Sequence, residues 1–210
     1  MYDVIFNVAL HSFYNGIAKE SYNEFREVSK TYDEITNGGK SWDFGSHTKE
    51  ENQVYQRTNH GMQKHCIIST VFFVMAIESL INEYGSVYLG EDQFKDKEKL
   101  GIMDKITEFY FEVKGSKFPR DKQLYQKIND LVSVRNNLVH SKPITIDSRM
   151  MMKNTKEADE QFWGYINSMF GNNKSKLSKQ KHMYEVLKQS YSTYEDLRDF
   201  LKGVDTRIKS

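Results

Sequence analysis

Three side chains near residue 140 are of the types that could act together on a phosphodiester bond: Arg135, Asn136 and His140. A histidine titrates near neutral pH, so it can accept or donate a proton during bond cleavage. A guanidinium can hold a phosphate and stabilise the negative charge that develops on it. On a helix, Asn136 and His140 would share one face, whereas Arg135 lies about 140° from His140. One copy of this segment therefore does not obviously make a complete site.

The segment that carries these residues reads as a helix. Its apolar residues recur at spacings of three, four and seven: Leu124, Ile128, Leu131 and Leu138. Pro143 should end the helix near His140, because proline disfavours helical geometry in the residue before it. A narrow polar stripe occupies the opposite face: Asn129, Ser133, Asn136, Asn137 and His140.

Arg135 interrupts the apolar face, since it lies four residues after Leu131 and three before Leu138. An unpaired guanidinium in such a place costs several kcal/mol or more, so something must meet it. One reading is a structural ion pair, and the other is a phosphate in a cleft or subunit interface. We predict that Glu78, in an apolar helix beside Asn82, meets Arg135 or another positive group nearby. The alternative is that Glu78 is half exposed at one end of a bundle.

The residues from Arg135 to His140 resemble the motif of HEPN-domain ribonucleases, in which an Arg, usually followed by a polar residue, precedes a His by four to six intervening residues. The stretch Ala-Ile-Glu-Ser-Leu-Ile-Asn at 76–82 also looks like the second core helix of many HEPN domains. The resemblance covers about residues 1–145. It implies an all-α fold, an antiparallel bundle of four core helices, here with additional C-terminal helices.

The same resemblance implies an enzyme, a metal-independent endoribonuclease that leaves a 2′,3′-cyclic phosphate or 3′-phosphate and a 5′-hydroxyl. Its catalytic residues would be Arg135, Asn136 and His140, with Glu78 and Asn137 in support. HEPN ribonucleases place two motifs, one from each subunit of a homodimer, in a shared cleft. The expected setting is a bacterial toxin or antiphage defence, with RNA as substrate and an antitoxin or activator protein as a possible further partner.

Composition favours one helical, soluble domain over 1–210, with a core at about 1–145 and a helical extension at about 146–210. The 210 residues contain only two prolines, 38% hydrophobic and 28% charged residues, and a net charge of +1. A single cysteine, Cys66, suits a reducing cytoplasm. We expect no secretory signal, no apolar run long enough to span a bilayer and no membrane partner. His60 and His65 are not spaced as a metal pair on a helix, so we expect neither a metal nor another cofactor.

Apolar spacings predict helices over six stretches: 2–36, 50–84, 96–114, 124–140, 155–170 and 176–202. The first should bury Phe13 and end at Asn37-Gly38-Gly39. Trp42 and Phe44 should pin the following loop to the body, or stack on a base. Residues 85–95 read as a loop around Gly90. The third helix should bury a stripe on one face: Leu100, Met103, Ile106, Tyr110 and Val113.

A basic run follows the motif, with no Asp or Glu between Gln161 and Tyr184. Its lysines are candidate contacts to an RNA backbone, together with the lysine just after the motif: Lys142, Lys174, Lys176, Lys179 and Lys181. The same run would equally serve as a solvated loop.

Three functions remain open from the sequence. A ribonuclease should lose RNA cleavage on His140→Ala while keeping its fold. A non-catalytic HEPN module that binds RNA or a partner protein should bind without cleaving, and its RNA affinity should fall with salt. A plain helical scaffold should lose about 3–5 kcal/mol of stability on Arg135→Ala and little on His140→Ala.

Overall fold

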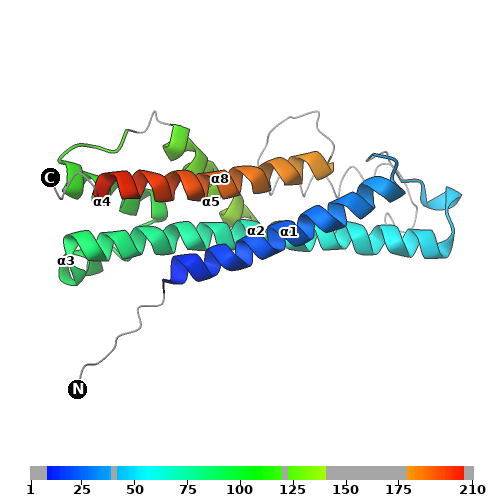
Figure 1. Ribbon diagram of the computed structural model, residues 1–210, viewed down its shortest axis with the longest axis horizontal. Helices are drawn as coiled ribbons and strands as arrows, with labels where there is room; N and C mark the ends of the chain where they lie inside the picture. The colour runs from blue at the N-terminus through cyan, green and yellow to red at the C-terminus, as the bar shows by residue number, and fades with distance from the viewer. Residues whose placement is uncertain (1–8, 39–41, 120–122, 141–178, 206–210) are drawn as a thin grey trace, which may run out of the picture.

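Two long helices, α1 (Leu10–Ile35) and α2 (Lys49–Leu89), run antiparallel along each other and form the frame of the molecule (Figure 1). The computed structural model describes residues 9–38, 42–119, 123–140 and 179–205. Small side chains let the two helices approach closely, and the Ser69 hydroxyl of α2 donates a hydrogen bond of 2.9 Å to the Ala18 carbonyl of α1. The predicted helix over 2–36 is thus confirmed from Leu10 onward, and residues 1–8 lie outside the described part.

The turn between these helices is capped on both sides, and its first cap is the predicted stop at Asn37-Gly38. Asn37 and Gly38 adopt positive φ angles of 50° and 80°, and the Gly38 N–H donates to the Asp33 carbonyl at 2.9 Å. This backbone bond satisfies a carbonyl that would otherwise be orphaned at the end of α1. At the start of α2, Thr48 and Glu51 form a capping box, and the backbone N–H of Thr48 holds the pKa of Glu51 below its usual value.

Trp42 and Phe44 pin the connecting loop to α2, as predicted. The Trp42 ring stacks on Tyr55 with centroids 4.9 Å apart, and its indole N–H donates to Asn52 Oδ1 at 2.8 Å. Phe44, in the short 3-10 helix η1 (Phe44–Ser46), meets the same tyrosine edge-on at 5.5 Å. Both aromatics therefore have structural partners within the chain.

The prediction of a loop over 85–95 was wrong. α2 continues to Leu89, Gly90 turns the chain at φ 80°, and the short helix α3 (Glu91–Lys95) folds back against α2. Gly85 makes this possible, because a Cβ there would lie 2.2 Å from Cε2 of the buried Phe94 ring. Gly85 is needed for close approach rather than as a helix breaker.

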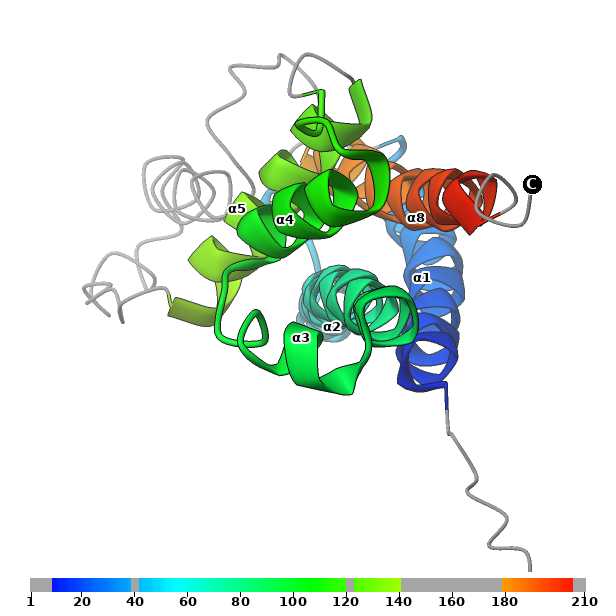
Figure 2. The same ribbon diagram turned by 90° about the vertical axis from the view of Figure 1, so that its left-hand side faces the viewer.

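Three further helices pack over α2: α4 (Ile102–Lys114), α5 (Gln123–His140) and α8 (Lys179–Asp205) (Figures 1 and 2). The described residues form helices and turns and no strand, so the predicted all-α class is confirmed. The four-helix arrangement of a HEPN core stays a prediction. The predicted helix over 155–170 lies outside the described residues.

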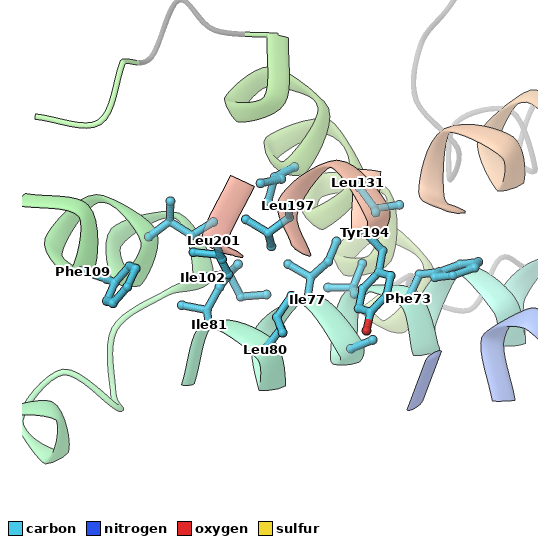
Figure 3. Close-up of a cluster of buried hydrophobic side chains, with 14 of the residues drawn as sticks. Phe73, Ile77, Leu80, Ile81, Ile102, Phe109, Leu131, Tyr194, Leu197 and Leu201 are labelled. Carbon is cyan, nitrogen blue, oxygen red and sulfur yellow. The ribbon is translucent and has the colours of Figure 1, made fainter. Parts of the chain in front are cut away.

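The apolar side chains fall into two neighbouring clusters. The larger lies between the second half of α2, Ala18 of α1 and helices α4, α5 and α8, and its members include Phe73, Ile77, Ile102, Leu131 and Leu197 (Figure 3). The smaller joins the second half of α1 to the first half of α2 and to α5 and α8. Because α8 contributes to both clusters, its packing completes the helical body in the described part of the chain.

α8 was predicted over 176–202, and its buried residues follow a heptad-like pattern: Met183, Leu187, Ser190, Tyr194, Leu197 and Leu201. Tyr184 and Tyr191 of the same helix are exposed over about a third of their surface and lie beside Tyr22 of α1. The rings therefore line the edge of the α1–α8 contact rather than its centre.

Two predicted apolar stripes are confirmed only in part. Phe13 is 59% exposed, and Tyr14 packs against the larger cluster in its place. In α4, the predicted Ile106 is buried, and the predicted Met103, Tyr110 and Val113 are partly buried against the larger cluster. Leu100 precedes the helix and is exposed, and the centre of the buried face also holds Lys105, between Ile102 and Phe109. Lys105 therefore places a positive charge on the buried face of α4, which the sequence analysis did not predict.

The composition of α2 bears on the expectation that no apolar run could span a bilayer, which stays a prediction. By length and composition, this helix contains an 18-residue window apolar enough to cross a bilayer, and half of that window is buried inside the molecule. Polar residues such as Ser69 and Thr70 divide this window into shorter apolar runs, none of which is long enough to cross a bilayer by itself. The central helix of a bundle passes the same test, because neighbouring helices surround it.

Substitution of Gly85 by Ala should lower the free energy of unfolding by roughly 1–3 kcal/mol, because the added methyl group overlaps the Phe94 ring. Gly16→Ala is the matched control: a Cβ at Gly16 meets nothing within 4 Å, so this change should stabilise α1 by up to about 1 kcal/mol. Denaturant unfolding of both variants would measure the difference. Equal effects of the two changes would show that the Gly85–Phe94 contact is not limiting.

Candidate active site

A buried lysine and a carboxylate form the centre of the polar cluster between α2 and α4. Lys105 Nζ donates to Glu78 Oε1 and to Asn82 Oδ1, each at 3.1 Å. The Lys105 side chain is 3% exposed, and that of Glu78 is 33% exposed. A buried ammonium requires partners because desolvation disfavours its charge, and the two acceptors one turn apart on α2 provide them.

Arg135 reaches the other oxygen of the same carboxylate. Its Nη2 lies 3.8 Å from Glu78 Oε2, and its Nη1 donates to the Asn136 side-chain oxygen at 2.9 Å. The predicted contact between Glu78 and Arg135 is therefore confirmed, as is the expectation of a positive group near Glu78. Three helices meet here, since Glu78 lies on α2, Lys105 on α4 and Arg135 on α5.

Arg135 lies at the edge of the apolar face of α5, not in its middle. Val134 takes the buried position, next to Ile128 and Leu131, and the Arg135 side chain is 23% exposed. A contact at 3.8 Å in a partly solvated place is a weaker ion pair than the one that Lys105 makes. The guanidinium thus keeps access to solvent while its other side faces Glu78.

The remaining motif residues lie on an open surface of α5. Asn136, Asn137 and His140 are all exposed, as the predicted polar stripe requires, and His140 is the last described residue of α5. The predicted end of this helix before Pro143 lies outside the described residues. The Asn136 side-chain oxygen accepts a hydrogen bond from Arg135, so this amide lies against the guanidinium. Within the described residues, no hydrogen bond or ion pair joins His140 or Asn137 to Arg135.

The lysines proposed to contact RNA cannot be placed around this site. Lys142, Lys174 and Lys176 lie outside the described residues. Lys179 and Lys181 belong to the first turn of α8, and their side chains are likewise outside the described part. Their role therefore stays a prediction.

Lys105 is the site residue that the sequence analysis missed. Its signal was present: Lys105 lies three residues after Ile102 and four before Phe109, both apolar, which puts it on one helical face with them. The stripe chosen instead, through Met103 and Tyr110, is rotated from the buried face by about one residue. Like Arg135, Lys105 is a cation within an apolar stripe, so it too requires a partner for its charge.

Other histidines have structural surroundings. His11 Nδ1 lies 2.6 Å from Glu83 Oε2, the His47 ring stacks on Trp42 at 3.8 Å, and burial lowers the pKa of His65. Burial also raises the pKa of the Cys66 thiol, so it is kept protonated and is a poor nucleophile. Within residues 9–38, 42–119, 123–140 and 179–205, no group of three or more His, Cys, Asp or Glu side chains could hold a metal ion.

Comparisons of this chain with protein-family models, with curated proteins and with solved structures found no match.

Removal of the shared carboxylate should cost far more stability than removal of the arginine. Glu78→Ala leaves the buried Lys105 charge without its ion-pair partner, and we expect a loss of about 3 kcal/mol. Arg135→Ala removes a partly exposed, longer contact and should cost about 1 kcal/mol or less. Chemical denaturation of both variants measures these values. An Arg135→Ala loss as large as that of Glu78→Ala would favour the scaffold reading, in which Arg135 is mainly structural.

Proposed function

We propose that this protein is an endoribonuclease of the HEPN type, in which Arg135 holds the scissile phosphate and His140 transfers a proton. The motif residues support the proposal by their places on α5: a partly exposed guanidinium, followed by an exposed polar stripe that ends in His140. The resemblance of this segment to HEPN ribonucleases supplies the reaction class.

The observation that carries the proposal is the charge balance around Arg135. The cluster contains two cations, Lys105 and Arg135, which share a single carboxylate, Glu78. Within the described residues no other acidic side chain lies within 4 Å of either cation. Among the described residues one positive charge is therefore in excess, on the partly exposed guanidinium, and a phosphate group would balance it.

In the proposed reaction the ribose 2′-hydroxyl attacks the adjacent phosphorus, and His140 takes the proton of that hydroxyl. Arg135 stabilises the negative charge on the phosphorane oxygens as the bond forms. The bond to the 5′ oxygen then breaks, which gives a 2′,3′-cyclic phosphate and, after protonation of the leaving oxygen, a 5′-hydroxyl. Each group acts through charge or proton transfer that its side chain can perform at neutral pH.

A second copy of the chain would supply the missing geometry. Arg135 and His140 are five residues apart on α5, so their side chains leave the helix in directions about 140° apart. In a homodimer that brings two α5 helices together, the Arg135 of one copy could act with the His140 of the other. The exposed Val139 between them gives such a contact an apolar residue.

The test is cleavage of RNA by the purified protein in excess EDTA, with new ends identified by mass spectrometry. The wild type should produce cyclic-phosphate ends, and His140→Ala should lower the cleavage rate by at least about 100-fold, because it removes the proton-transfer group. His60→Ala is the matched control, since His60 is also an exposed helical histidine but belongs to α2 and not to the motif.

Three other results would decide against the proposal. Equal cleavage by wild type and His140→Ala would place the activity elsewhere or in a contaminant. An effect of His60→Ala as large as that of His140→Ala would point to a nonspecific loss. A folded wild type that binds RNA in a salt-dependent way, but never cleaves it, would establish the non-catalytic binding module instead.

A further inference from the structure

The proposed reaction gives no role to Lys105, because its ammonium is buried and does not reach solvent. It takes the closer place at Glu78, at 3.1 Å from Oε1, and it is fixed further by Asn82 at 3.1 Å. Arg135 approaches the opposite oxygen only to 3.8 Å. The carboxylate is therefore shared unequally between a buried cation and a partly exposed one.

This unequal sharing sets the charge that Arg135 presents to a ligand. The interaction of two charges grows as their distance and the local dielectric constant fall, so the negative charge of Glu78 is balanced mainly by the nearer, more deeply buried Lys105. Without Lys105, Glu78 and Arg135 would form a closed neutral pair, and a phosphate would have to compete with the carboxylate for the guanidinium.

We infer that Lys105 is a positioning residue that keeps Arg135 available to a phosphate by occupying Glu78. Lys105 touches no substrate in this arrangement and acts through the carboxylate. The inference deepens the proposed function and rests on it, because it assumes that Arg135 is the group that meets the RNA phosphate.

Binding to a short 2′-O-methyl RNA of mixed sequence tests this inference, since that probe cannot be cleaved through a 2′-hydroxyl. Fluorescence anisotropy with the full chain would give its Kd. We expect Lys105→Met to raise the Kd roughly tenfold, within the usual range for coupling between two sites. The double variant Lys105→Met/Glu78→Gln removes both charges and should return the Kd to within about twofold of the wild type.

Glu78→Gln alone separates this role from a purely structural one. It leaves the buried Lys105 without a charged partner, so its thermal stability should fall, yet it leaves Arg135 unopposed, so its affinity for the probe should rise a few-fold. A structural role would change affinity and folded fraction in the same direction. Thermal unfolding of each variant gives the folded fraction by which each Kd is corrected.

Lys127→Met is the matched control for the loss of one positive charge. Lys127 lies on α5 and pairs with Asp196 of α8 at 2.8 Å, away from Glu78. This variant should bind the probe as the wild type does. If it weakens binding as much as Lys105→Met does, the effect is one of overall charge and the inference fails.

Two further outcomes would also overturn the inference: an unchanged Kd in folded Lys105→Met, or a double variant that stays as weak as the single one. The Arg135→Ala variant distinguishes a failure of the inference from a failure of the proposed function. If Arg135→Ala binds the probe as the wild type does, the inference is wrong whatever the RNA cleavage assay shows. If binding depends on Arg135 and Lys105 as expected but RNA is never cleaved, the inference stands and the ribonuclease proposal alone fails.

Discussion

The ion pair between Lys105 and Glu78 is the constraint around which three helices are arranged. A lysine that is 3% exposed cannot keep its charge without a close acceptor, so α4 must place it against Glu78 and Asn82 on α2. That requirement fixes how α4 lies on α2, and it also fixes where the second carboxylate oxygen points. α5 then brings Arg135 to that oxygen, so a structural necessity in the core determines the surroundings of a surface guanidinium.

Much of the helical framework could be predicted from the sequence because its signals are local. The turn at Asn37-Gly38, the helix that carries Arg135 and the helix over α8 follow from residue types within a few positions. The errors came where tertiary contacts override local signals. Gly85 reads as a helix breaker, but its missing side chain makes room for Phe94, a contact that only the folded chain reveals.

The candidate site was predictable to the extent that charge in an apolar setting demands a partner. That rule placed Glu78 opposite Arg135 without any structure, and the 3.8 Å contact agrees with it. The rule did not identify Lys105, because the stripe predicted for α4 is shifted by about one residue from the centre of the buried face. That shift assigned Lys105 to the surface. The directions of side chains that leave two different helices depend on crossing angles, which the sequence of one chain does not encode locally.

The length of α2 has a consequence for communication within the molecule. Tyr55, where the Trp42 loop is stacked, and Glu78 are 23 positions apart on one uninterrupted helix, which corresponds to a separation of about 35 Å. Charges interact over only about 8–10 Å at physiological ionic strength. A partner that binds at the loop end therefore cannot alter the Glu78 cluster through its electric field. It would have to act mechanically, by tilting or shifting α2 as a rigid lever against α4 and α5.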